Sequence, residues 1–272
     1  AGGLEGSVTN FLSPGDKALF VNGGKFGERW GKICAAYGVK GEEIKVEWGY
    51  AVKPEQIKAA LQKDPSIKAV FTQANETSTG VAHPIREIGE VVKQFEGTLM
   101  VVDAVSAMGV FDIQTDAWGL DIVVTGSQKS FMIPPGLAFI SIGKKAWAKG
   151  ETATLPRFYF NLKKEAKIAS AGESAWTPNT SHLLALAEAL KYIKSIGMDK
   201  LVENAQGLAK ATRAAAQALG LREARGDPDQ MLRRHAREAG RRGNDARPPP
   251  LERRARHDAV LHGEDAEQRQ VH

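Results

Sequence analysis

Short apolar runs alternate with segments of helical spacing along much of the chain, and this alternation limits the folds that it can adopt. Strands that alternate with helices indicate a mostly parallel sheet covered on both faces. The sequence therefore predicts an α/β fold with a mostly parallel, mixed sheet between helices. We expect strands at 17–22, 43–48, 67–74, 99–104 and 121–127, an antiparallel strand at 136–143, and helices at 27–37, 53–63, 83–95, 182–197 and 199–219.

Polar, turn-rich segments follow four of the expected strands. Their sequences are NGGKFGERW, TQANETSTG, VDAVSAMG and TGSQKS. In an open α/β sheet, ligands bind in the crevice outside the carboxyl ends of the strands. The topology alone therefore predicts that these four loops meet at one ligand site.

Lys129 and Asp103 are charged residues of these segments whose side chains could take part in a reaction. Lys129 precedes a largely apolar segment, and a lysine that loses its solvation there is a nucleophile for carbonyl groups. A plain surface lysine is the simpler interpretation. Asp103 ends the apolar strand LMVVD, where a buried carboxylate needs a cation or hydrogen bonds. A protonated pyridine nitrogen is one such cation, whereas a helix cap is the commoner role.

Two further loop residues have both a functional and a structural interpretation. Thr77 offers a hydroxyl in the loop NETSTG, where such side chains commonly cap turns. Phe26 precedes Gly27, which lets a planar ligand approach its ring, but simple core packing also explains it. Each signal is weak alone, and the four together favour one site.

Composition excludes several classes of protein. The 272 residues are 42% hydrophobic and 25% charged, which rules out collagen, a disulfide scaffold and bulk disorder. The single cysteine, Cys34, cannot form an internal disulfide and fits a reducing cytosol. No apolar run approaches the ~20 residues of a membrane span, and the first residues lack the layout of a signal peptide. We expect a cytoplasmic protein with no membrane partner.

The composition changes abruptly at residue 220. Residues 221–272 contain twelve arginines and neither lysine nor aromatic residues, whereas residues 1–220 contain four arginines and all the aromatic residues. We expect 1–220 to form the folded domain. Three interpretations of the rest stay open: a basic arm for nucleic acid, a disordered extension, or a GC-rich gene read out of frame. Ten interleaved acidic residues argue against a nucleic-acid partner, and the Arg, Ala, Gly, Pro and His bias favours the third.

Several motifs together resemble the class V aminotransferases, which are pyridoxal-phosphate enzymes of fold type I. The most specific is VVDAVSAMG, whose aspartate is followed 26 residues later by the lysine of VTGSQKSFMIPPGLAF. The segments NGGKFGERW, NETSTGV and LPRFYFNLKK resemble the same family in the same order. The alanine–glyoxylate and serine–pyruvate (serine–glyoxylate) aminotransferases are the most similar group. The resemblance implies that 1–220 is the cofactor-binding large domain with the start of a connecting helix, and that the C-terminal small domain is missing or replaced.

The resemblance also implies a role for individual residues. Lys129 matches the lysine that forms a Schiff base with the cofactor, and Asp103 matches the aspartate paired with the pyridine nitrogen. Phe26 and Val105 match the residues on the two ring faces, and Thr77 matches a hydroxyl near the phenolic oxygen. Phosphate contacts are implied for Gln128, for Gly2 with Ala1 and Gly3 at a helix N-terminus, and for Thr177, donated across a dimer interface.

The implied activity is ping-pong transamination from a small amino acid, alanine or serine, to a 2-oxo acid, glyoxylate or pyruvate. The freed amine of Lys129 is implied to move the Cα proton of the substrate. A homodimer is implied, and no metal is expected.

From the resemblance we expect this chain to lack two parts of the family pattern, namely the arm before the phosphate loop and the small domain with its carboxylate-binding arginine. The alternative is therefore an incompetent fragment that at most binds the cofactor. Another class V enzyme, such as a lyase of the cysteine desulfurase kind, fits less well, because Cys34 lies in the middle of an expected helix.

Overall fold

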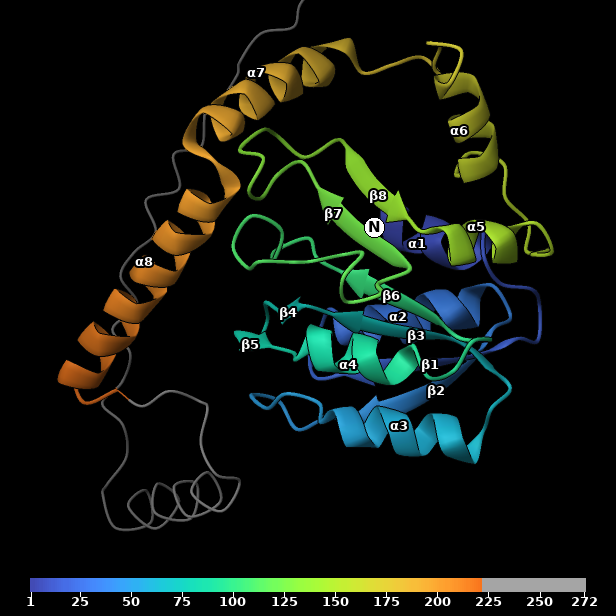
Figure 1. The fold of residues 1–272 in the computed structure, drawn as a ribbon, viewed down its shortest axis with the longest axis horizontal. Coiled ribbons are helices and arrows are strands. Elements are labelled where there is room, and N and C mark those ends of the chain that lie inside the picture. Colours follow the sequence, from blue (N-terminus) through green and yellow to red (C-terminus); the bar gives the residue numbers. More distant parts are fainter. Residues whose placement is uncertain (222–272) are drawn as a thin grey trace, which may run out of the picture. The chain divides into compact units, whose positions relative to one another are not determined.

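A six-stranded sheet forms the centre of the computed structural model, which describes residues 1–221 (Figure 1). Its strands are β1 (Lys17–Asn22), β2 (Lys40–Lys45), β3 (Ile67–Gln73), β6 (Leu99–Asp103), β7 (Ile122–Gly126) and β8 (Ala138–Ile142). They lie in the order β2-β1-β3-β6-β7-β8, and only β8 pairs antiparallel with its neighbour. The predicted α/β fold with a mostly parallel, mixed sheet is confirmed.

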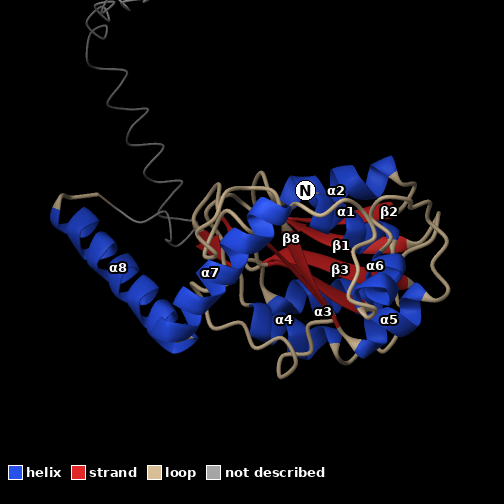
Figure 2. Cartoon of the chain, turned by 90° about the horizontal axis from the view of Figure 1, so that it is seen from above, coloured by secondary structure: helices blue, strands red, loops and turns tan. Residues whose placement is uncertain are grey.

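Helices cover both faces of this sheet (Figure 2). In β6, Leu99 and Val101 pack with one pair of helices, while Met100 and Val102 pack with the other pair. Because alternate residues of a strand face opposite sides, each central strand contributes to two cores, which explains the continuous apolar runs of the sequence. The first pair is α1 (Gly2–Thr9) with α2 (Gly27–Ala36), and the second is α3 (Pro54–Lys63) with α4 (Ile85–Val92).

One aromatic pair fixes α2 against the sheet. Trp30 of α2 is fully buried and stacks on Phe71 of β3, with the ring centroids 4.6 Å apart and 23° between the planes. Such a pair contributes about 0.5–1.5 kcal/mol beyond the burial of its surface. The N-terminal end of α2 is therefore held close to the carboxyl end of β1.

The carboxyl ends of β1, β3, β6 and β7 lie at the same edge of the sheet, because these strands are parallel. The register there pairs Gln73 with Asp103, and Asp103 with Val124. The loops that follow these four strands consequently meet at this edge, as the topology predicted.

Several elements differ from the prediction. The strand expected at 43–48 is β2 and lies three residues earlier, because its pairing with β1 runs through Lys40–Lys45, whose side chains are mostly exposed. The two-residue strands β4 (Asn75–Glu76) and β5 (Val81–Ala82) and the short helices α5 (Lys144–Gly150) and α6 (Leu162–Ala169) were not predicted.

Two long helices end the described part of the chain. They are α7 (Thr180–Ile196) and α8 (Met198–Ala218), both within two residues of the predicted bounds. No helix in the described part of the chain is long and apolar enough to cross a membrane. The domain boundary at 220 stays a prediction, and apart from Leu221 the arginine-rich segment 221–272 lies outside the described residues.

Candidate active site

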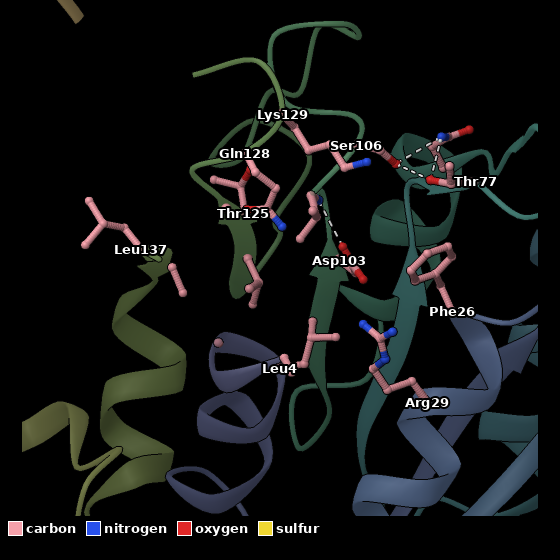
Figure 3. A pocket seen from close by; sticks show the side chains of 17 residues that line it. Leu4, Phe26, Arg29, Thr77, Asp103, Ser106, Thr125, Gln128, Lys129 and Leu137 are labelled. Atoms are coloured by element: carbon pink, nitrogen blue, oxygen red, sulfur yellow. Dashed lines mark hydrogen bonds between the residues drawn. The ribbon is translucent and has the colours of Figure 1, made fainter. Parts of the chain in front are cut away.

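A cavity of about 370 Å³ lies at the carboxyl edge of the sheet, where the four loops meet (Figure 3). It is lined by side chains from the loops after β1, β3, β6 and β7, together with the start of α1. Six of the eight predicted site residues line this one cavity: Phe26, Thr77, Asp103, Val105, Gln128 and Lys129.

Asp103 places a carboxylate inside the cavity. It is the last residue of β6 and is 6% exposed. Its Oδ1 accepts a hydrogen bond from the Val105 N–H at 2.9 Å, and no helix follows, so Asp103 closes a turn rather than capping a helix. Burial raises the pKa of Asp103, although the Val105 N–H and the positive charge of Arg29 oppose the shift. A cationic group of a ligand would stabilise the ionised form further.

Lys129 stands on a loop whose two ends are fixed. The Ser127 hydroxyl donates to the Pro134 carbonyl at 2.8 Å and accepts from the Leu137 N–H at 3.2 Å. The Ser130 hydroxyl donates to the Met108 carbonyl of the neighbouring loop. These contacts hold the segment on both sides of Lys129.

The Lys129 side chain lines the cavity but is exposed (Figure 3). Of the two interpretations of Lys129, this exposure fits the plain surface lysine, since segment 131–135 is itself exposed or half-buried.

Phe26 forms one wall of the cavity. It is half-buried at the N-cap of α2 and belongs to neither hydrophobic core, so it is not a core-packing residue. The guanidinium carbon of Arg29 lies 5.1 Å from the centroid of the Phe26 ring, a cation–π arrangement. Arg29 also lines the cavity and points toward Asp103 in Figure 3. Sequence reasoning missed Arg29, although its spacing of three residues from Phe26 on a helix is a usable signal.

Three polar side chains form another part of the wall. The Thr77 and Ser106 hydroxyl oxygens lie 2.7 Å apart, and Asn75 Nδ2 donates to Ser106 at 3.0 Å and to Thr77 at 3.4 Å. Ser106 and Asn75 were not predicted, although each lies within two residues of a predicted residue in its motif. The group joins the loops after β3 and β6 beside the cavity.

The remaining predicted residues are Gly2, at the start of α1 beside the cavity, and Thr177, which does not line it. Ala1 and Gly3 line the cavity, whereas Gly2 does not. A Cβ on Gly3 would lie 2.6 Å from Val124 Cγ1, so α1 packs on β7 only with glycine there. Thr177 is exposed, lies between α6 and α7, and does not line the cavity. The roles of all eight residues stay predictions.

Cys34 is placed where it cannot act as a nucleophile. It is fully buried in α2, and burial raises the pKa of its thiol to about 12. A thiol with such a pKa stays protonated at neutral pH and is inert. Separately, residues 1–221 contain no group of three or more His, Cys, Asp or Glu side chains that could hold a metal ion.

Comparison with known proteins relates this site to a family. The family model described as aminotransferase class-V matches residues 4–237. Over 223 residues the chain is 44% identical to the soluble hydrogenase small subunit of Synechococcus sp., covering 81% of this chain and 58% of the relative. Over 224 residues it is 35% identical to the L-aspartate–glyoxylate aminotransferase of Paracoccus denitrificans, covering 81% and 57%.

A solved structure shares the fold as well. The alanine–glyoxylate aminotransferase of Nostoc sp. matches with a TM-score of 0.76 and 27% identity, covering 80% of this chain and 58% of that one. The chain thus spans little more than half the length of the proteins that it matches. Because the family model covers most of its residues, the chain belongs to the class V aminotransferases and has the fold of pyridoxal-phosphate enzymes of type I.

Proposed function

We propose that this chain is the cofactor-binding part of an aminotransferase that moves an amino group between a small amino acid and a 2-oxo acid. One observation carries the proposal: the buried carboxylate of Asp103 and the amine of Lys129 line the same cavity, with Phe26 as a wall. The loops that supply them come from three different strands, so this arrangement depends on the whole sheet.

The side chains of the cavity fit pyridoxal phosphate. Asp103 forms no ion pair within residues 1–221, so its buried carboxylate suits a protonated ring nitrogen. Phe26 and Val105 offer apolar surfaces for a flat ring, and the start of α1 offers backbone N–H groups for a phosphate. When bound, the cofactor supplies a ring that withdraws electrons from the reacting carbon.

Each residue then has a definite task. The Asp103 carboxylate would keep the ring nitrogen protonated, and Phe26 and Val105 would flank the ring. The Thr77 hydroxyl would hydrogen-bond the ring edge. The Lys129 amine would take the proton from the substrate Cα and pass it to the cofactor carbon that is bonded to the amino nitrogen, and general acid–base transfer of this kind contributes roughly 10²–10⁴-fold in rate.

Relatives support the proposed substrates. Glyoxylate occurs in the names of the Paracoccus denitrificans relative, the Hyphomicrobium methylovorum serine–glyoxylate aminotransferase and the Nostoc sp. structure. We therefore propose glyoxylate or pyruvate as the amino acceptor, alanine or serine as the donor, and a ping-pong order in which the first product leaves before the acceptor binds. Cytoplasm is the proposed location.

The proposed assembly is a homodimer in which Thr177 reaches the partner's phosphate site. Its neighbour Trp176 stacks on Tyr159, with the ring centroids 5.2 Å apart, and packs near Phe158 at 5.3 Å. Phe158 is 79% exposed and Tyr159 is 59% exposed. Exposed aromatic surfaces are typical of protein interfaces. This cluster therefore supports the proposal that a second copy of the chain packs on it.

A visible absorbance band tests the cofactor assignment. Purified protein mixed with pyridoxal phosphate is expected to gain such a band, and Lys129→Ala is expected to lose it. Lys53→Ala, which removes an exposed lysine of the α3 N-cap, is the matched control and should keep the band. Reduction with borohydride and peptide mapping should then place the cofactor on Lys129.

The reaction itself is tested by adding substrates to the same sample. L-alanine or L-serine should bleach the band, and glyoxylate or pyruvate should restore it. A band that responds to no amino acid would support the alternative, a fragment that only binds the cofactor. The absence of any band would contradict the cofactor site. A desulfurase-type lyase is disfavoured by the buried, protonated Cys34.

A further inference from the structure

Glu76 is a fully buried carboxylate at the junction of two loops that line the cavity. One carboxylate oxygen accepts hydrogen bonds from the Gly27 N–H at 2.9 Å and from Gln73 Nε2 at 3.1 Å. The other accepts from the Phe26 N–H at 3.3 Å, the Ser78 N–H at 3.2 Å and the Ser78 hydroxyl at 2.5 Å. Five donors from both loops and from β3 thus meet on one side chain.

These donors explain how the carboxylate is buried among residues of the two loops. Helix α2 begins at Gly27, and the first N–H groups of a helix have no partner within it. The helix dipole also favours a negative charge at this end. Glu76 therefore caps α2 from a loop that is 49 residues away in the sequence.

Glycines allow the two loops to approach this closely. A Cβ on Gly24 would lie 2.5 Å from Glu76 Cδ and 2.4 Å from the Ser78 hydroxyl oxygen. A Cβ on Gly27 would lie 2.5 Å from the Val21 carbonyl oxygen. The loop between β1 and α2 consequently has no room for a larger side chain at Gly24 or Gly27, where it meets Glu76.

The same carboxylate adjoins two residues of the proposed cofactor site. It holds the backbone of Phe26 directly, and Thr77 follows it in the chain. A second link joins the same loops, because the Lys25 N–H donates to the Ser78 hydroxyl at 3.0 Å. Movement of Glu76 would therefore shift one wall of the cavity relative to another.

We propose that Glu76 is a positioning residue that clamps the β1–α2 loop to the loop after β3, so that Phe26 and Thr77 are held ready for the cofactor ring. The identity of the ligand rests on the proposed function, whereas the clamp itself does not. Glu76 touches neither substrate nor cofactor and acts only through its two neighbours.

Glu76→Gln tests the clamp with almost no change of volume. The new amide nitrogen faces N–H donors, so one side of the cluster loses its acceptor. We expect the variant to bind pyridoxal phosphate about tenfold more weakly, as the loss of one hydrogen bond to a charged group predicts. In the protein without cofactor, we expect amide hydrogen exchange at Phe26 and Gly27 to accelerate about tenfold or more.

Asp121→Asn is the matched control. Asp121 also accepts a backbone hydrogen bond, from the Met100 N–H at 2.8 Å, and does not line the cavity. This variant should lose thermal stability yet keep the affinity for pyridoxal phosphate and the exchange rates at Phe26 and Gly27. If Glu76→Gln behaves like Asp121→Asn in all three measurements, the clamp is refuted.

Ser78→Ala keeps the proposal testable if Glu76→Gln fails to fold. Ser78 is exposed, and its alanine variant removes the hydroxyl contacts to Glu76 and to the Lys25 N–H only. We expect faster exchange at Phe26 and about threefold weaker cofactor binding, and unchanged values of both would overturn the clamp. If the wild-type protein binds no pyridoxal phosphate while exchange still accelerates in the variants, the proposed function fails and the clamp stands.

Discussion

The Thr77 and Ser106 hydroxyl oxygens lie 2.7 Å apart and join two loops whose residues are 29 positions apart in the sequence. Asn75, which lies two residues before Thr77, donates a hydrogen bond to the Ser106 hydroxyl. Asn75 also donates to Thr77 at 3.4 Å, and either hydroxyl can be the donor between Thr77 and Ser106. In the arrangement in which Ser106 donates, the Thr77 proton is left for a ligand oxygen at the proposed ring edge.

Thr77→Val tests this donor, since valine keeps the shape and removes the hydroxyl. A net hydrogen bond contributes about 1 kcal/mol, so we expect roughly fivefold weaker binding of pyridoxal phosphate, measured by absorbance titration. Thr77→Ser should bind nearly as well as the wild type. Thr79→Val makes the same change in the same loop outside the cavity, and an equal loss in both valine variants would contradict the role of Thr77.

His83 is expected to make the fold sensitive to acid. It is 5% exposed, its Nδ1 accepts from the Val52 N–H at 3.1 Å, and burial lowers its pKa from 6.5 to about 4, with Glu76 opposing the shift. Below pH 6.5 the unfolded state binds more protons than the folded state. The contribution of the neutral His83 to the free energy of unfolding is therefore fully present above pH 6.5. It is lost as the pH drops toward 4, by roughly 3 kcal/mol in all.

Urea unfolding at pH 7 and pH 4.5 measures this loss. His83→Gln should be less stable at pH 7, because the Val52 contact changes, but should lose less stability between the two pH values. His182→Gln, at a half-buried histidine, should show the wild-type dependence. The same pH dependence in His83→Gln and the wild type would show that another group carries the acid sensitivity.

The fold was predictable where strands are buried on both faces. In β3 and β6 nearly every residue is buried, so an apolar run marks the strand itself. In β2 the pairing residues are mostly exposed, and the apolar Ile44, Val46 and Trp48 shifted the expected strand toward the following segment. Helix α6 buries no residue and α5 has seven residues, so neither has an apolar stripe that a sequence pattern could reveal.

The shared cavity was predictable where one short motif contains both a strand end and a residue with a reactive or aromatic side chain. Asp103 ends β6, Phe26 and Lys129 stand in the loops that follow β1 and β7, and the strand order alone brings the three together. Glu76 was missed, because its partners Phe26 and Gly27 are distant in the sequence and meet it only through tertiary packing. The sequence left open two environments for Lys129, the surface and an apolar surrounding, because the choice depends on how segment 131–135 folds.

Gly109→Ala is expected to disturb the loop of Lys129. Gly109 has a φ of 76°, and a Cβ there would lie 2.7 Å from Ser130 Cβ. Gly38 has a φ of 69° with nothing within 4 Å of such a Cβ, so Gly38→Ala has only the backbone strain of about 1 kcal/mol. We expect Gly109→Ala to lose more stability than Gly38→Ala and, unlike it, to bind pyridoxal phosphate more weakly. Equal unfolding free energies and affinities would show that Ser130 moves aside.

Met132→Gly is expected to stabilise the chain. Met132 is the one non-glycine residue of the described chain with a positive φ, at 58°, and it is 54% exposed, so little packing is lost. Glycine relieves the strain and adds chain entropy to the unfolded state, for a net gain of about 0.5 kcal/mol. Met198→Gly, at an exposed methionine that begins α8, should instead destabilise. Denaturant unfolding measures both, and a loss in Met132→Gly would mean that its side chain has a contact worth more than the strain.

Mixing two inactive variants tests whether Thr177 acts across a dimer interface. Thr177 is exposed and does not line the cavity of its own chain. We expect Thr177→Ala and Lys129→Ala each to bind the cofactor poorly as separate samples. In a mixed dimer, one site receives Lys129 from the first variant and Thr177 from the second, so one intact site of two should form.

The recovered absorbance band measures that complementation after the two variants are unfolded and refolded together. Random pairing makes half of the dimers mixed, so about a quarter of the wild-type band should return, because each mixed dimer has one intact site of two. If Thr177 instead acts within its own chain, mixed dimers contain no intact site and no band returns. Asp103→Asn mixed with Lys129→Ala is the control, since both residues line the same cavity of one chain, and this mixture should show no more band than the two variants give as separate samples.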